Sequence, residues 1–155
     1  MARAPRPLLL PLPLALLAPF VACGQPALCE LEEKVVWTCQ TPGKILSLCS
    51  SPTLEGPNAY LEYRAGTVMA KEFVFPEDRA NSVKRFSVTQ LAKGVSLTFQ
   101  NGGYSYTIFE PLSGKTSIDV RRDSRVLSTL RCIEASDTLT ETKSLNLFRK
   151  LGILR

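Results

Sequence analysis

The stretch that decides the fold class is Val95-Ser-Leu-Thr-Phe-Gln-Asn-Gly-Gly-Tyr-Ser-Tyr-Thr-Ile-Phe-Glu110. Asn101-Gly102 predicts a type I′ hairpin turn, because both central residues of that turn need positive φ. Gln100 would then pair with Gly103, and the alternation of apolar and polar residues on both arms agrees with that register. The expected pairs on the apolar side are Phe99 with Tyr104, Leu97 with Tyr106 and Val95 with Ile108.

Further short apolar stretches, separated by turn residues every 8–12 positions, flank this hairpin. The predicted strands include 34–39, 44–49, 60–64, 68–75, 83–91, 116–121 and 126–133. Together they predict a mainly β fold, a small antiparallel barrel or sandwich of about seven to eight strands. Thr138-Leu-Thr-Glu141 fits a capping box, so we also expect a C-terminal helix that ends at Gly152.

The N-terminus has the pattern of a secretory signal. Arg3 and Arg6 precede an apolar run at 8–18 that contains no charged residue. That run is too short and too rich in proline for a transmembrane helix, so we expect an exported protein without a transmembrane span. The expected organisation is a signal peptide at 1–22, a β domain at 23–133 and a partly helical tail at 134–155.

The residues around the expected cleavage site leave two alternatives open. Phe20-Val-Ala-Cys-Gly24 resembles a bacterial lipobox, which makes Cys23 a candidate lipid attachment site, although Phe20 stands where leucine is usual. Ordinary cleavage after Gly24 is the other alternative. The protein is therefore expected in the periplasm, either as a lipoprotein or as a free protein.

Four cysteines remain in the exported chain and predict disulfide bonds, because export leads to an oxidising compartment. They are Cys29, Cys39, Cys49 and Cys132. Four cysteines allow three pairings, and the sequence alone does not choose among them.

The composition excludes several functional classes. The 155 residues contain no histidine, which rules out Ser–His–Asp and Cys–His catalysis and every metal site that needs imidazole. The formal net charge of +5 falls to +3 once Arg3 and Arg6 leave with the leader, which is too mild to indicate nucleic-acid binding. We therefore expect a protein that is not an enzyme and has no cofactor.

Several motifs resemble those of small exported proteobacterial proteins of uncharacterised function. In order, they are Lys44-Ile-Leu-Ser-Leu-Cys-Ser-Ser51, Tyr60-Leu-Glu-Tyr-Arg64, Asn101-Gly-Gly-Tyr-Ser-Tyr-Thr-Ile-Phe109 and Leu130-Arg-Cys132. The resemblance covers about residues 39–132, and its Asn-Gly-Gly-Tyr block is the most specific part. It implies a bacterial periplasmic setting and supplies no activity. The proline-rich leader, Cys29 and the tail after Ile133 depart from the pattern.

Three groups of residues are candidate sites. The aromatic residues with polar tips suit a ligand groove for sugars or peptides, although a sheet core with tyrosine hydroxyls at its rim is the favoured interpretation. They are Trp37, Tyr60, Tyr63, Tyr104 and Tyr106. The arginines at 121, 122, 125 and 131 suit anionic headgroups or a solvated face. Glu30, Glu32 and Glu33 are expected to be solvated.

The sequence thus predicts a non-catalytic, exported cell-envelope domain that binds a protein or an envelope component. One alternative is a small-molecule carrier with an apolar cavity inside a β-barrel. Another is an inhibitor of a lysozyme-like enzyme, which rests on size, location and fold class alone.

Overall fold

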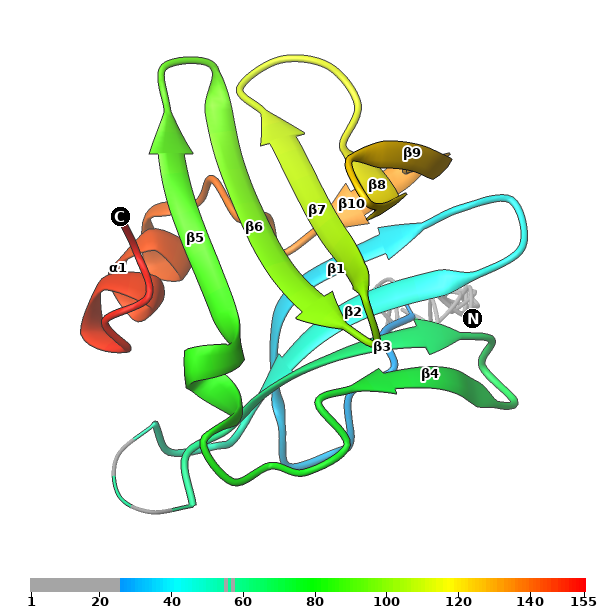
Figure 1. Cartoon of the computed structure of the whole chain (residues 1–155). Coiled ribbons are helices and arrows are strands. Elements are labelled where there is room, and N and C mark those ends of the chain that lie inside the picture. The colour runs from blue at the N-terminus through cyan, green and yellow to red at the C-terminus, as the bar shows by residue number, and fades with distance from the viewer. Residues whose placement is uncertain (1–25, 55, 57) are drawn as a thin grey trace, which may run out of the picture.

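The computed structural model describes residues 26–54, 56 and 58–155 (Figure 1). The predicted signal peptide and the candidate lipid site Cys23 lie outside the described residues.

Within the described residues, ten antiparallel strands form two five-stranded sheets, and one α-helix follows them near the C-terminus (Figure 1). The first sheet has the order β10-β1-β2-β3-β4, and its strands are β10 (Glu134–Ser136), β1 (Lys34–Gln40), β2 (Ile45–Ser50), β3 (Leu61–Gly66) and β4 (Lys71–Phe75). The second sheet consists of β5 (Phe86–Leu91), β6 (Gly94–Asn101), β7 (Tyr104–Pro111), β8 (Ser117–Arg122) and β9 (Arg125–Arg131), in that order. The mainly β prediction is confirmed, and of its two architectures the sandwich is the correct one for the described strands.

The number of strands exceeds the prediction partly because a short strand, β10, forms directly after the predicted strand 126–133, in the segment that was predicted as tail. Cys132 donates its backbone N–H to Thr116 beside the second sheet, and Ile133 donates to Gln40 of the first sheet. The chain therefore crosses from one sheet to the other at these two residues, and β10 pairs with β1.

The central hairpin forms, but the predicted pairing is wrong by two residues. The central residues of its turn are Gly102 and Gly103, with φ of 56° and 81°, and Asn101 pairs with Tyr104 instead. Two glycines adopt positive φ without a steric penalty, so this turn competes well with one centred on Asn101-Gly102. A shift of two residues keeps every side chain on its predicted face, because the faces of a strand alternate with period two.

The observed register builds the aromatic part of the core. Phe99 pairs with Tyr106, and their rings stack at 4.7 Å with an interplanar angle of 5°. Phe99 also stacks on Phe75 of the first sheet at 4.6 Å, so the hairpin joins the two sheets through ring contacts. Trp37 and Leu48, also in this core, are fully buried in the first sheet.

Two disulfides confirm the prediction for the four cysteines and resolve their pairing. Cys39 on β1 is bonded to Cys132, where the chain leaves the second sheet, across 93 residues of sequence. Cys29 is bonded to Cys49 on β2, across 20 residues. The first bond therefore joins the two sheets, and the second fixes the segment before β1 to the first sheet.

The predicted C-terminal helix is confirmed as α1 (Thr142–Lys150), but it begins later than the capping box suggests. Glu110 accepts the backbone N–H groups of Leu139 and Thr140, which are therefore engaged outside the helix. Gly152, with φ of 69°, ends the helix as predicted.

Two predicted boundaries are wrong. The predicted strand 83–91 begins with a 3₁₀ turn, η1 (Ser82–Arg85), and only 86–91 is extended. The predicted strands 60–64 and 68–75 leave 65–67 as their connection, but β3 continues through Gly66 and the turn is closed by reciprocal backbone hydrogen bonds between Thr67 and Ala70. Among the described residues, no helix combines the length and apolarity needed to cross a membrane.

Candidate functional site

The outer faces of the two sheets differ, because among the described residues a segment of chain covers only the first. Residues 26–33 lie across β2 and β3, where the Leu28 N–H binds the Ser47 hydroxyl at 3.0 Å. Arg64 donates to the Leu28 carbonyl at 2.8 Å, and the Cys29–Cys49 disulfide holds the same segment covalently. The outer face of the first sheet is therefore closed.

A buried ion network lies under this segment. The Arg64 side chain, 1% exposed, donates from Nη1 to Glu33 Oε2 at 2.5 Å and from both Nε and Nη2 to Glu62. Arg79, at the protein surface, lies 3.3 Å from a carboxylate oxygen of each of these two glutamates. The Tyr60 hydroxyl donates to Glu33 at 2.7 Å. Two arginines thus balance two glutamates, as buried charge requires.

The network keeps Glu33 ionised. Burial alone would raise the pKa of Glu33, but hydrogen bonds from Arg64, the Glu30 backbone and Tyr60 outweigh it and lower the pKa to about 2. Burial and the bond to Glu33 raise the pKa of the Tyr60 hydroxyl to about 12. A carboxylate held in this way accepts fixed hydrogen bonds, which suits a structural role better than proton transfer.

The expectation that Glu30, Glu32 and Glu33 are all solvated is wrong for Glu33. Its side chain is only 2% exposed, whereas Glu30 and Glu32 are exposed. The reason is tertiary: its partner Arg64 lies 31 residues away in sequence and no local pattern signals the pair.

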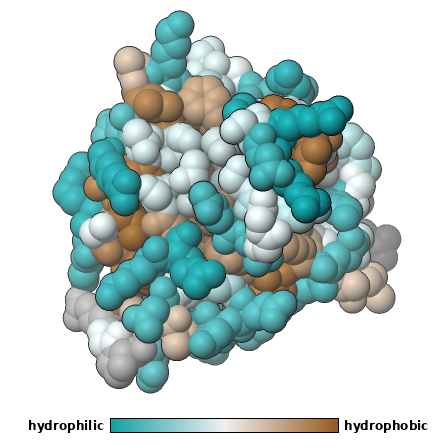
Figure 2. All heavy atoms as spheres, in the orientation of Figure 1, coloured by the Kyte–Doolittle hydropathy of each residue, from teal (hydrophilic) through white to brown (hydrophobic). Residues whose placement is uncertain are grey.

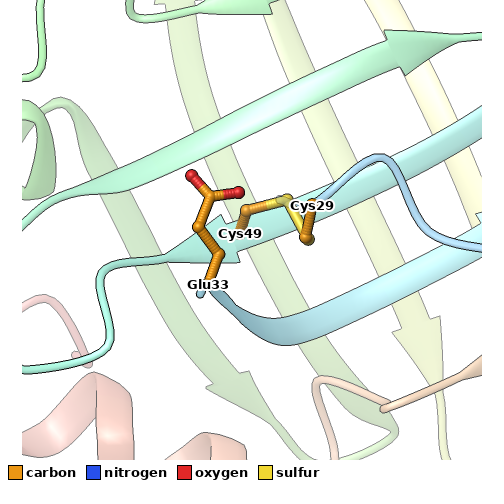
Figure 3. A group of neighbouring side chains, drawn as sticks. All are labelled: Cys29, Glu33 and Cys49. Carbon is orange, nitrogen blue, oxygen red and sulfur yellow. A yellow bond between two sulfur atoms is a disulfide. The ribbon is translucent and has the colours of Figure 1, made fainter. Parts of the chain in front are cut away.

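Cys29, Cys49 and Glu33 bring potential metal-ligand atoms within 4.8 Å of one another (Figure 3). The two sulfur atoms are bonded to each other, however, so neither is available as a thiolate ligand. The Glu33 carboxylate is already bound by Arg64, Arg79 and Tyr60. These three residues are therefore a disulfide packed beside an ion network, and their ligand atoms are engaged within the protein.

The outer face of the second sheet, by contrast, is lined with hydroxyl groups. Alternate residues of β5, β6 and β7 project away from the core, and most of them are serine or threonine: Ser87, Thr89, Ser96, Thr98, Ser105 and Thr107. Figure 2 looks onto this face and shows side chains of intermediate hydropathy near its middle, with strongly hydrophilic ones around them. Such hydroxyls both donate and accept hydrogen bonds.

Two adjoining depressions of about 600 and 640 Å³ lie on this face. They share Gln100, Ser105 and Thr107, and we call them together the outer groove. The other polar residues that line the outer groove are Tyr104, Arg121, Asp123 and Ser124 at one end, and Lys84, Arg85, Ser87, Thr98 and Arg155 at the other. Four cationic side chains against one carboxylate side chain make the lining of the outer groove positive.

The arginine end of the outer groove is only lightly engaged by the protein itself. Arg121 approaches Asp119 at 3.5 Å, and its side chain is 45% exposed. Arg122, which does not line the outer groove, stands next to it over the Tyr104 ring at 5.5 Å and reaches Asp123 at 3.8 Å. A guanidinium group has five N–H donors, so the contact of Arg121 with Asp119 leaves it donors for an anionic ligand as far as the described residues go.

The five aromatic residues predicted for a ligand groove are not brought together. Trp37 and Tyr63 are buried in the core, and Tyr106 packs inward against Phe73 and Phe99. Tyr60 belongs to the ion network on the first sheet. Tyr104 alone among them lines the outer groove.

The arginines predicted as a cluster divide between two places. Those at 121, 122 and 125 surround the β8–β9 turn, while Arg131 ends β9. The residues that the sequence analysis missed are the network members Glu62 and Arg64 and the groove cations Lys84 and Arg85. Glu62 and Arg64 alternate with Leu61 and Tyr63, so period two signals their shared face but not that this face is covered.

Comparisons with family models, with curated proteins and with solved structures find no match for this chain. The function is therefore inferred from the geometry of the molecule itself.

Proposed function

We propose that this protein is a non-catalytic binding domain of the bacterial cell envelope, which holds an anionic glycan in the outer groove. One observation carries the proposal: a row of hydroxyl side chains with cations at both ends lies on the one sheet face that no described segment covers. The hydroxyl groups and the Gln100 amide match the hydroxyls of a sugar chain. The basic ends match its carboxylate or phosphate groups.

The size and shape of the outer groove support an extended ligand. Each depression falls within the range of about 300–1,000 Å³ that ligand sites usually occupy. The two adjoin through Gln100, Ser105 and Thr107, so a chain of several sugars can span both. The polar floor favours a hydrated ligand over an apolar one.

The carrier alternative has less support. It needs an apolar cavity of at least about 300 Å³. The space between the sheets is filled by core side chains, and the largely apolar depression beside Val36 and Leu147 measures about 240 Å³. We therefore carry the glycan-binding proposal forward.

The proposed location follows from the leader and from the disulfides. The two disulfides indicate an oxidising, exported compartment. The secretory pattern and the lipobox-like motif support the periplasm, with Cys23 as the candidate lipid attachment site. Intact mass spectrometry of the natively exported protein tests this: a diacylated Cys23 supports the anchor, and a free N-terminus after Gly24 removes it.

Calorimetric titration of the exported protein tests the glycan proposal. The probes are a hexasaccharide of galacturonate, which carries one carboxylate per ring, and maltohexaose, a neutral hexasaccharide. We expect the galacturonate hexasaccharide to bind more tightly than maltohexaose. Its affinity should fall as salt is raised from 50 to 200 mM, because the screening length of exposed charges is about 10 Å at 0.1 M salt and shortens as salt increases.

Charge-matched variants locate the site. Lys84→Gln with Arg85→Gln removes two charges from the outer groove, and Lys34→Gln with Arg149→Gln removes two from the first sheet and α1. We expect about tenfold weaker binding, roughly 1.4 kcal/mol, for the first pair and little change for the second. Equal effects of both pairs, or no binding of the galacturonate, would contradict the proposal.

A further inference from the structure

The β9 strand is an unusually open edge of the second sheet. It pairs with β8 on one side, and its other side has no partner strand among the described residues. Six of its seven residues are exposed, and Leu130 is half-buried. The backbone groups on the free side are available to another extended segment.

The opposite edge of the same sheet shows how such an edge is covered in this protein. The Val88 N–H on β5 donates to the Ile153 carbonyl at 2.8 Å, and the Arg155 N–H donates back to the Val88 carbonyl at 2.8 Å. The C-terminal residues thus lie parallel to β5 as an added segment. The β9 edge has the same backbone chemistry, and within the part of the chain that the structure describes no segment covers it.

The side chains of β9 define what its partner must carry. Arg125 and Arg131 stand at the two ends, and between them Val126 and Leu127 are 44% and 52% exposed. The strand itself contains no acidic residue. An extended segment with apolar residues in its middle and an acidic residue at each end complements this arrangement.

Two acidic residues, one on β8 and one in the β8–β9 turn, are already engaged. Asp119 accepts the Thr129 hydroxyl at 2.7 Å and approaches Arg121 at 3.5 Å. Asp123 approaches Arg122 at 3.8 Å. Neither carboxylate is paired with Arg125 or Arg131 in these contacts.

A second copy of this chain fits the edge poorly. The strand reads Arg-Val-Leu-Ser-Thr-Leu-Arg and is nearly symmetric about Ser128. Antiparallel pairing of two copies about that residue would place Arg125 of one copy opposite Arg131 of the other, and opposed like charges destabilise a sheet. Residues 1–25 fit no better, because they contain two arginines and no acidic residue.

We propose that the free edge of β9 is an interaction surface that takes an acidic, extended segment of another exported protein as a sixth strand of the second sheet. The arginines at both ends then have two effects: they discourage self-association, and they select an acidic partner. The affinity itself comes from main-chain hydrogen bonds along the edge. This inference does not depend on glycan binding in the outer groove.

A synthetic peptide tests the proposal on the full exported chain. It has seven residues, the length of β9, with glutamate at both ends and alternating valine and threonine between them. Nuclear magnetic resonance should show shifts of the β9 backbone amides at 125–131 when the peptide binds. Replacing both glutamates by glutamine, or Arg125→Gln with Arg131→Gln in the protein, should weaken binding at least tenfold.

Two further peptides separate strand addition from simple charge attraction. Each is N-methylated on alternate amides, one on the odd positions and one on the even positions. Strand addition uses only every second amide, so one methylated peptide should lose binding and the other should keep it. The proposal would be overturned if both methylated peptides bound equally well, or if the largest amide shifts lay outside β9. Concentration-dependent dimerisation of the protein through 125–131 would also overturn it.

Discussion

Arg64 donates a hydrogen bond from Nη2 to Oε1 of Glu33 at 2.7 Å, and this contact joins β3 to the segment that covers it. The Arg64 side chain is almost fully buried, and Glu33 and Glu62 balance its charge beneath the covering segment. No described segment covers the outer face of the second sheet in this way, and the proposed function is assigned to that face.

The Glu33 contact predicts how stability depends on pH. The folded pKa of Glu33 is about 2, below its ordinary value of 4.5, so the unfolded chain binds this proton more readily. The contribution of Glu33 to the free energy of unfolding is therefore complete above about pH 5 and is lost as the pH falls towards 2. Urea unfolding of wild type and Glu33→Gln between pH 7 and 2 should show a smaller decrease for the variant.

Glu32→Gln, at an exposed position next to Glu33, is the matched control for that series. It should follow the wild-type curve across the whole range. A Glu33→Gln curve parallel to wild type between pH 5 and 2 would show that Glu33 does not carry this pH dependence.

Burial predicts very different costs for the two arginines of the network. Arg64→Met leaves two buried carboxylates short of their main partner and should cost about 3–5 kcal/mol of unfolding free energy. Arg79→Met removes a side chain that is 44% exposed and contacts the same carboxylates, so it should cost about 1 kcal/mol or less. Thermal and urea unfolding measure both.

A compensated variant keeps this prediction testable where Arg64→Met fails to fold. Combining Arg64→Met with Glu33→Gln and Glu62→Gln removes the unpaired charges and should recover part of the lost stability. Equal costs for the Arg64 and Arg79 substitutions, or no recovery in the triple variant, would contradict a buried ion network.

The sequence predicts a structural feature well when the residues that form it are close together in the chain. The hairpin at 95–110 has its strand faces predicted correctly, because alternation is a local property. The register of the hairpin is not predicted correctly, because Gly102-Gly103 and Asn101-Gly102 can both occupy the central positions of the turn. The choice between them depends on packing, such as that of Phe99 against Tyr106.

Contacts between residues far apart in the chain could not be predicted from the sequence, because they depend on how the whole chain folds. The cysteines predict disulfides, but the choice of Cys132 as partner of Cys39 depends on the chain crossing between the sheets. The burial of Glu33 depends on Arg64 in the same way. The outer groove was also missed, since its cations come from 84–85, 121 and 155, which the fold alone brings together.

The two disulfides should differ in what they contribute. Cys39–Cys132 closes a loop of sequence separation 93, and Cys29–Cys49 closes one of 20. The chain-entropy model assigns them about 4.7 and 3.3 kcal/mol. Paired alanine substitutions, compared by urea unfolding, should therefore show the larger loss for the first bond, and the reverse order would contradict this account.

Glu110 should determine how firmly the tail is attached. Its carboxylate is 4% exposed and accepts the N–H groups of Leu139 and Thr140 and the Thr140 hydroxyl. Glu110→Ala should cost about 1–3 kcal/mol and speed hydrogen exchange at those two amides. Glu77→Ala, at an exposed position, is the control. Unchanged exchange at 139 and 140 would contradict the role of Glu110.

The most direct test of the central claim is the position of the bound glycan. A ¹⁵N spectrum of the exported protein, titrated with the galacturonate hexasaccharide, reports every backbone amide at once. The account predicts that the largest shifts fall on the outer groove, at Gln100, Ser105, Thr107 and Arg121, with little change on the closed face at Ser47 and Arg64. Shifts centred on the first sheet, or none at millimolar ligand, would contradict it.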